Sequence, residues 1–461
     1  MDAADPHPIP TTDRNAQTVA PPKPRFGEAL RYWWKLGWIS FGGPAGQIAI
    51  MHRELVEQKR WISEARFLHA LNYCMVLPGP EAQQLATYIG WLLHRTWGGI
   101  VAGALFVLPS LAVLIALSWI YMAFGNVPAV AGALYGIKPA VTAIVLHAAW
   151  RIGSRALKSP PLWAIAAAAF VAIYFLGVPF PAIVLAAGLL GAAGGKLAPK
   201  HFAAGGAHGA DAAAHPPAVI DNDTPTPAHA RFRWSRLIIV VAVALSLWLA
   251  SLGALVVAFG SESALAQMGW FFTKAAMVTF GGAYAVLPYV VQGAVETFGW
   301  LTPPQMIDGL ALGETTPGPL IMVVAFVGFV GGWATQLFGP EHVFLAGAAA
   351  AGVATWFTFL PSFMFILAGG PLVESTHGQM KFTAPLTGIT AAVVGVIVNL
   401  AVFFAYHVLW PEGLHERFDV VSALIGVAAA AALFRYKAGV IPVILACAVA
   451  GLVITLARAA L

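Results

Sequence analysis

A short stretch of sequence that occurs twice, at a fixed spacing, constrains the fold of this chain more than any other feature. A Phe-Gly-Gly motif at residues 41–43 recurs at residues 280–282. A Pro-Gly-Pro motif at residues 78–80 recurs at residues 317–319, and both pairs are separated by 239 residues. We therefore predict two copies of one structural unit, with the functional site where the copies meet.

Long uncharged segments identify the class of protein. Hydrophobic residues make up 59% of the chain and charged residues only 10%, too few to cover a water-soluble protein of this length. Segments without Asp, Glu, Lys or Arg, each longer than the roughly 20 residues that span a bilayer, are Thr96–Ile137, Pro160–Gly195, Leu237–Ser261, Thr315–Pro340 and Phe382–Pro411. We predict an all-α polytopic membrane protein.

The order of polar and apolar segments predicts five parts. They are a disordered cytoplasmic tail at 1–25, a first repeat at 26–196, a flexible cytoplasmic linker at 197–233, an extra transmembrane helix at 234–260 and a second repeat at 261–461. Each repeat is expected to start with four short helices that form two hairpins entering the membrane part-way. Four long apolar helices follow in each repeat.

The spacing between the copies changes once along the chain. A Leu-Pro-Ser motif at residues 108–110 recurs at residues 360–362, a separation of 252 rather than 239 residues. The second copy is therefore expected to carry 13 additional residues, near Gln336–His342.

The distribution of basic residues predicts that the two copies have opposite orientations. Between Gly43 and Trp97 the first copy carries five Lys or Arg residues, whereas the second copy carries none between Lys274 and Lys381. Short cytoplasmic loops are enriched in Lys and Arg. The hairpin base of the first copy should thus face the cytoplasm and that of the second copy should face outward, which is the inverted-repeat arrangement of secondary transporters.

Two lysines, Lys35 and Lys274, occupy equivalent positions on the first short helix of each copy. Their neighbours differ, because Arg31 corresponds to Trp270. A charged residue within a membrane segment is costly and is a candidate for function. We expect the two lysines to contribute positive charge to an anion site, or else to extend their ammonium groups to the lipid headgroups.

Helix breaks at the repeated motifs are the second candidate feature. A broken helix exposes backbone N–H groups, and a helix N-terminus attracts anions. Pro80 and Pro319 suit the first turn of the helices that follow. The residues expected to form an anion cradle are Phe41, Gly42, Gly43, Pro78, Gly79, Pro80, Phe280, Gly281, Gly282, Pro317, Gly318 and Pro319.

Polar side chains near these breaks complete the set of candidates. Gln83, Gln84 and Asn72 could donate hydrogen bonds to an oxyanion, and Glu81 and Glu314 could carry a coupling proton. The sequence has no clustered acid, base or metal-ligand constellation and no phosphate-binding loop. We therefore expect no enzymatic activity, no metal and no cofactor.

The chain resembles the chromate ion transporter family in its long, two-domain form, over residues 26–457. The resemblance rests on Phe41-Gly42-Gly43-Pro44, on the run from Asn72 to Gly90, on Leu108-Pro109-Ser110, and on the second-copy motifs at 280–282 and 316–319. It implies efflux of chromate across the cell inner membrane, driven by the proton motive force, and resistance to chromate.

Two other functions fit the same sequence features. A carrier for sulfate or another oxyanion, or an anion channel of the same fold, would have the same composition and symmetry. The expected partners are an oxyanion, protons and the lipid bilayer, with a homodimer left open. Nucleic acid is not expected, because the excess positive charge lies at helix ends, where it determines membrane topology.

Overall fold

The structure is a computed structural model that describes residues 20–41, 43–202, 217–222, 224–280, 282–376, 383–413, 415 and 417–460. The regular structure of these residues is helical, and their β-type pairing is limited to an isolated bridge between Ile62 and Ile220. Within them, seven helices are long and apolar enough to cross a membrane. The predicted all-α polytopic fold is therefore confirmed.

The first repeat begins with short helices separated by breaks. These are α1 (Phe26–Ile39), α2 (Gly43–His52) with a π-helical turn η2 (Arg53–Gln58), and α3 (Glu64–Val76). The longer helices are α4 (Glu81–Phe124), α5 (Pro128–Ala156), α6 (Pro160–Leu176) and α7 (Phe180–Leu197). The backbone of α4 turns sharply at His94 and Arg95, where φ is −134° and +57°, so its first part corresponds to the predicted fourth short helix.

The second repeat follows α8 (Pro199–Phe202) and the extra helix α9 (Trp234–Phe259). Its short elements are α10 (Ala264–Val278), α11 (Ala283–Val291) with a π-helical turn η3 (Gln292–Thr297), α12 (Pro303–Thr315), η4 (Leu320–Met322) and α13 (Val323–Ala334). After η5 (Pro340–His342), the long helices are α14 (Val343–Thr376), α15 (Thr383–Leu409), α16 (Val420–Phe434) and α17 (Val440–Ala460). The predicted insertion is confirmed, because the connection from α13 to α14 replaces the sharp kink of α4.

The backbone repeats in its details as well as in its helices. The two π-helical turns begin at equivalent residues, Arg53 and Gln292. Positive φ values also recur at equivalent positions: +69° and +98° at Gly43 and Gly282, +51° and +61° at Arg60 and Gly299, and +121° and +99° at Gly79 and Gly318. The two repeats are therefore two copies of one fold, and both Pro-Gly-Pro motifs break a helix as predicted.

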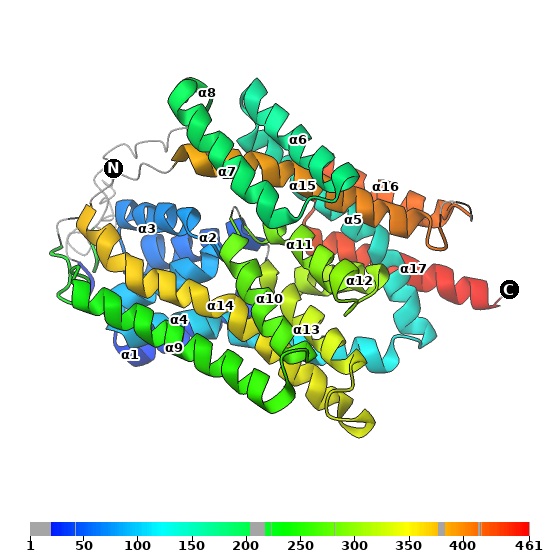
Figure 1. Cartoon of the computed structure of the whole chain (residues 1–461), viewed down its shortest axis with the longest axis horizontal. Coiled ribbons are helices and arrows are strands. Elements are labelled where there is room, and N and C mark those ends of the chain that lie inside the picture. Colours follow the sequence, from blue (N-terminus) through cyan, green and yellow to red (C-terminus); the bar gives the residue numbers. More distant parts are fainter. Residues whose placement is uncertain are drawn as a thin grey trace, which may run out of the picture.

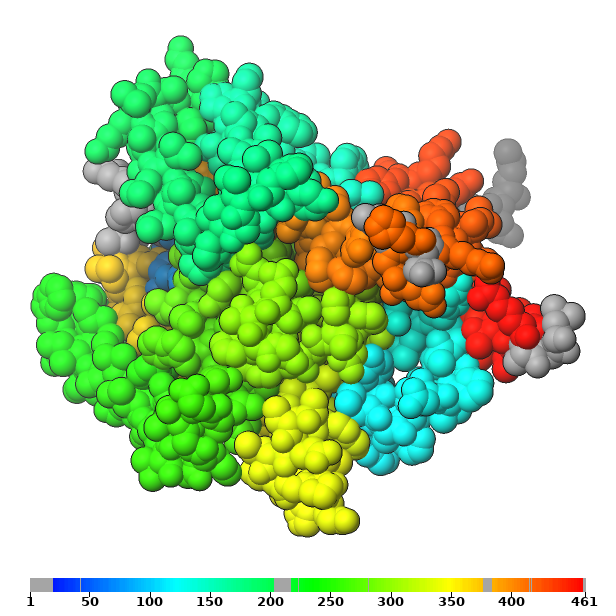
Figure 2. Space-filling view, turned by 45° about the vertical axis from the view of Figure 1, so that its right-hand side comes forward, coloured from blue at the N-terminus to red at the C-terminus, as the bar shows by residue number. Residues whose placement is uncertain are grey.

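The short helices of the second repeat lie between two groups of long helices (Figure 1). Helix α14 packs against α13, α10 and α4, and α9 covers α14 on its outer side. On the other flank, α15 packs against α6, α7 and α5, and α17 packs against α5. Figure 2 shows the short helices of the second repeat, in yellow-green, in the middle of one face of the molecule. The short helices of the second repeat are thus held between two groups of long helices, whereas one face of α1 is exposed, at Leu30, Trp34 and Trp38.

The linker departs from the prediction of a flexible segment. Its residues 217–222 and 224–233 pack on the base of the first hairpin, where the Ile220 N–H donates to the Trp61 carbonyl at 3.1 Å. The Ser63 N–H donates in turn to the Ile220 carbonyl at 2.9 Å. Backbone hydrogen bonds of this kind fix the segment, so the prediction is wrong for these residues. Residues 1–19 of the predicted tail and 203–216 of the linker lie outside the described part.

Candidate functional site

Each Pro-Gly-Pro segment is hydrogen-bonded to the end of the first short helix of the other repeat. The Gly79 N–H donates to the Thr279 carbonyl at 2.8 Å, and the Gly318 N–H donates to the Ser40 carbonyl, also at 2.8 Å. Both donors and both acceptors are equivalent residues in the two copies. Each repeat therefore supplies the partner for the helix break of the other. We call this region, formed by Ser40, residues 78–80, Thr279 and residues 317–319, the crossing.

The residues that end α1 and α10 make these carbonyls available. Ser40 and Thr279 are the C-caps of the two helices, and each hydroxyl donates at 2.6 Å to a carbonyl one turn back, at Leu36 and Ala275. Hydroxyls that bond to the preceding turn favour the end of a helix. The freed Ser40 and Thr279 carbonyls then accept from the glycines of the opposite repeat.

Glycine is required at both centres of the crossing. The φ values of Gly79 and Gly318 are strained for any residue with a side chain. A Cβ at Gly79 would lie 2.5 Å from Ser362 Oγ, and a Cβ at Gly318 would lie 2.7 Å from Ser110 Cβ. The serine of each Leu-Pro-Ser motif therefore contacts the glycine of the opposite repeat, a role for this motif that the sequence did not reveal.

Several buried polar groups around the crossing lack a partner. The Ser110 and Ser362 hydroxyls and the amide oxygens of Gln47, Gln83 and Gln84 are buried without a hydrogen bond to any described residue. An unpaired buried polar atom costs about 1–3 kcal/mol. Such a concentration of unpaired groups is typical of a site that binds a polar ligand or water rather than of a packed core.

The amide nitrogens of the glutamines fix the orientation of their side chains. Gln47 Nε2 donates to the Gly318 carbonyl at 2.6 Å, and Gln84 Nε2 donates to the Pro78 carbonyl at 2.8 Å. Gln83 Nε2 donates to Thr87 Oγ1 at 3.0 Å. Gln83 and Gln84 were predicted as site residues, whereas Gln47 was missed.

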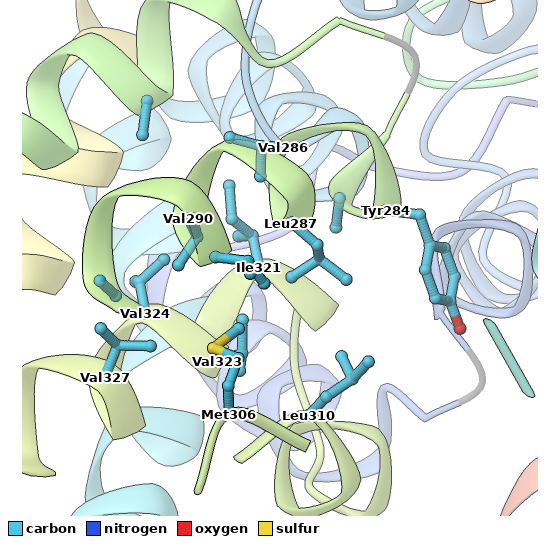
Figure 3. Close-up of a cluster of buried hydrophobic side chains, with 14 of the residues drawn as sticks. Tyr284, Val286, Leu287, Val290, Met306, Leu310, Ile321, Val323, Val324 and Val327 are labelled. Atoms are coloured by element: carbon cyan, nitrogen blue, oxygen red, sulfur yellow. The ribbon is translucent and has the colours of Figure 1, made fainter. Parts of the chain in front are cut away.

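The second repeat is apolar at the equivalent positions. Residues that correspond to Gln47, Gln83, Gln84 and Thr87 are Val286, Met322, Val323 and Phe326. All four are fully buried, and Figure 3 shows Val286 and Val323 within a cluster of packed aliphatic side chains. The expected cradle of two similar halves is therefore unequal, because the first repeat supplies the glutamines and the second supplies an apolar wall.

The two lysines have local partners. Lys35 Nζ lies 2.8 Å from Glu54 Oε1 in an ion pair, and the Lys35 side chain is 57% exposed. Lys274 Nζ lies 5.6 Å from the centre of the Trp270 ring, a cation–π contact. Neither contact involves the crossing, so a role of the lysines in anion binding stays a prediction.

The remaining predicted residues are spread around the crossing. Gly43 begins α2 and Gly282 is the N-cap of α11, while Gly42 and Gly281 lie outside the described residues. Pro80 and Pro319 are N-caps of α4 and η4, so both precede the first helical turn in which they were predicted. Phe41 is exposed and Phe280 packs against the core, next to the breaks that they precede.

The predicted carboxylates and Asn72 have different environments. Glu81 is the first residue of α4, at the edge of the crossing. Glu314 is hydrogen-bonded to the Tyr284 hydroxyl within the second repeat. Asn72 is on an exposed position of α3. The structure thus groups the glutamines and the Pro-Gly-Pro residues together but does not bring Asn72 to them.

A buried ion pair that sequence reasoning missed joins the two repeats. Arg66 Nη2 on α3 lies 2.6 Å from Glu374 Oε2 on α14, and the Tyr88 hydroxyl donates to the other oxygen of Glu374.

Among the described residues, no group of three or more His, Cys, Asp or Glu is placed to hold a metal ion.

Comparison with known proteins identifies the family of this chain. The chromate transporter family model matches residues 27–192 and 266–452, one segment in each repeat. The chain is 32% identical to a chromate transport protein of Pseudomonas aeruginosa, with 96% of each chain covered. It is 29% identical to a chromate transport protein of Cupriavidus metallidurans, with 94% of this chain and 93% of the relative covered. No solved structure matches the chain. The chain belongs to the chromate transporter family.

Proposed function

We propose that this protein exports chromate from the cytoplasm across the inner membrane, driven by the proton motive force, and thereby confers chromate resistance. The observation that carries the proposal is the crossing, where unpaired hydroxyl and amide groups surround two reciprocal glycine contacts. Two full-length relatives are named chromate transport proteins. The crossing lies at the interface of two repeats, where carriers of this architecture bind their substrates.

The chemistry of the crossing suits a tetrahedral dianion. Chromate has four oxygen acceptors, and the Ser110 and Ser362 hydroxyls could donate to it from opposite repeats. The N-terminus of α4 lies next to Gly79, and a helix N-terminus adds roughly half a positive charge and several N–H donors. These groups would replace part of the hydration of the anion without a bound metal ion.

The membrane potential favours the outward direction. An interior-negative potential contributes about 2.3 kcal/mol per charge per 100 mV to the expulsion of an anion. Proton exchange would add the pH gradient to this term. Glu81 and Glu314 remain candidates for the exchanging carboxylate, because each lies in or near a helix break.

The proposed orientation places the N-terminal segment, the linker and the base of the first hairpin in the cytoplasm. The linker contacts that base directly, through Ile220 and Trp61, so both lie on one side of the membrane. The same region carries the basic residues Arg53, Lys59, Arg60 and Arg66. This concentration of positive charge is typical of cytoplasmic loops.

The test is chromate accumulation in cells with and without the protein. We expect the intact chain to lower accumulation, and the Ser110→Ala/Ser362→Ala double variant to lose most of this effect. Ser118→Ala is the matched control, because Ser118 is another buried, unpaired serine of α4, two turns beyond Ser110. Unchanged accumulation with a well-expressed intact chain would refute chromate export. Inhibition of chromate export by excess sulfate would instead indicate a broader oxyanion carrier.

A further inference from the structure

A second polar site lies away from the crossing, between the end of α4, α5 and the start of α12. A cavity of about 350 Å³ is lined there by Tyr121, Asn126, Lys138, Gln305 and Asp308, together with apolar residues. The volume is within the range of roughly 300–1,000 Å³ that is usual for small-molecule sites. Under the proposed orientation, this cavity is at the outward-facing end of the protein.

The carboxylate of Asp308 is buried but only half satisfied. Its Oδ2 accepts a hydrogen bond from the Tyr121 hydroxyl at 3.0 Å and lies 3.5 Å from Lys138 Nζ. Its Oδ1 has no partner among the described residues, although the side chain is only 2% exposed. The Lys138 side chain is 29% exposed and lines the cavity. The lysine is thus accessible to a ligand, while the carboxylate is enclosed.

The Arg66–Glu374 pair provides a comparison for this arrangement. Both pairs clamp a hairpin helix against long helices, with Arg66 on α3 and Asp308 on α12. Both oxygens of Glu374 have partners, Arg66 at 2.6 Å and Tyr88. The distance from Lys138 to Asp308, 3.5 Å, is longer than the distance from Arg66 to Glu374. Lys138 is therefore free to exchange its partner, whereas Arg66 stays paired with Glu374.

We propose that Lys138 binds an oxyanion in this cavity and that this binding is coupled to protonation of Asp308. An anion that binds the Lys138 ammonium group removes the counter-ion of Asp308. A buried carboxylate without a counter-ion is costly in its charged form, so it takes up a proton from the water of the cavity. When the anion leaves, Lys138 pairs with Asp308 again and the proton is released.

The surroundings of Asp308 support this coupling. Among the described residues, the charged or titratable groups that face it are Lys138 from α5 and Tyr121 from α4. Gln305, one turn earlier on α12, also lines the cavity but is neutral. Lys138 is therefore the cation whose displacement would change the charge of the carboxylate. The inference rests on the proposed function, because it assigns a second oxyanion site to the same transporter.

The experiment is calorimetric titration of the purified full chain with sodium chromate, in buffers of different ionisation enthalpy and over a range of pH. We expect proton uptake approaching one per anion at this site, and an affinity that rises up to about tenfold for each unit of decreasing pH. Asp308→Asn should abolish the proton uptake and make the affinity independent of pH, at the value that the intact chain reaches at low pH. Lys138→Gln should weaken binding at least tenfold, and Lys138→Arg should restore it.

The outcomes separate this inference from the proposed function. Unfolding temperatures of the variants in detergent show which of them are folded. Proton uptake that persists in folded Asp308→Asn would overturn the coupling, and wild-type binding by Lys138→Gln would overturn the site. Either result could occur while the intact chain still lowers chromate accumulation in cells. Conversely, normal coupling without any cellular export would refute the proposed function alone.

Discussion

The side-chain amide of Gln47 donates a 2.6 Å hydrogen bond to the carbonyl oxygen of Gly318, across the boundary between the two repeats. This bond joins α2 of the first repeat to the helix break of the second. Its equivalent is missing on the other side, because Val286 occupies the corresponding position. The crossing therefore has a symmetric backbone and an asymmetric set of side chains.

This asymmetry predicts that exchanges at the two equivalent positions have different effects, one chiefly on chromate export and one on stability. Gln47→Val removes a polar group from the crossing and leaves the Gly318 carbonyl without this hydrogen bond, so we expect chromate export per folded molecule to fall at least tenfold, with a loss of stability of about 1–3 kcal/mol. Val286→Gln is the matched exchange, and it buries an amide in the apolar cluster at a cost of about 1–3 kcal/mol. Cellular chromate accumulation and the unfolding temperature in detergent measure the two effects. Loss of stability in Gln47→Val without loss of export in the remaining folded protein would contradict the prediction.

The crossing should not tolerate a methyl group. Gly79→Ala and Gly318→Ala place a Cβ at positive φ and within 2.5–2.7 Å of a serine of the other repeat. We expect each substitution to cost about 1–3 kcal/mol and to lower the unfolding temperature. Gly253→Ala is the control, since the space around Gly253 of α9 is open. Similar unfolding temperatures for all three variants would show that the crossing is not closely packed.

The ion pair between Lys35 and Glu54 allows a test of the lysine hypothesis. Lys35→Ala alone leaves Glu54, whose side chain is 8% exposed, without its counter-ion, so a loss of activity could reflect misfolding. Lys35→Ala/Glu54→Gln removes both charges and should fold like Glu54→Gln alone. We expect the double variant to export chromate several-fold more slowly than Glu54→Gln, because it lacks a positive charge near the first break. Equal rates would remove Lys35 from the binding site.

The linker should detach from the first hairpin at acidic pH. Burial lowers the pKa of His229, which lies outside the membrane-spanning segments, and its ring nitrogen donates to the Trp91 carbonyl at 2.9 Å. A lowered pKa means that the docked linker favours the neutral ring. Docking is therefore fully stable above the ordinary His pKa of about 6.5 and weakens as the pH falls below it.

A spin label at Thr226→Cys reports this detachment, and the native Cys74 and Cys447 are both buried and should react slowly. We expect the label to become more mobile between pH 7.5 and 5.5. His229→Gln should remove most of this pH dependence. A mobility that does not change with pH in the unmodified His229 background would contradict the role of this ring.

The orientation of the repeats is open to a direct test. A reporter enzyme that is active only in the periplasm should be active when inserted near Gln305 and silent when inserted near Glu57. These positions lie in the bases of the second and first hairpins. Equal activity at both positions, or the reverse pattern, would refute the proposed topology.

Helices and helix breaks were largely predictable because their signals are local. Uncharged apolar segments locate α9 and α15, and Gly-Gly and Pro-Gly-Pro motifs locate the breaks. The insertion before α14 followed from a change in the repeat spacing. Each of these features depends on residues that are close together in the sequence.

The set of residues that forms the site depends on contacts between the repeats, which a single sequence does not specify. Ser110 and Ser362 belong to a visible repeated motif, but only the packing of α4 and α14 brings them to Gly318 and Gly79. The pairing of Lys138 with Asp308 also requires two separate helices to meet. Gln47 could have been suspected from its replacement by Val286, because a polar residue that differs between equivalent positions is a sign of divided roles.

The reciprocal hydrogen bonds at the crossing have a consequence for the autonomy of each repeat. A half-length chain would expose a glycine N–H and a serine or threonine carbonyl whose partners belong to the missing half. Those groups would be left unpaired inside a bilayer, where water cannot replace the lost partners. Neither half should therefore complete its own fold alone, although two co-expressed halves could assemble by exchanging the same pair of bonds.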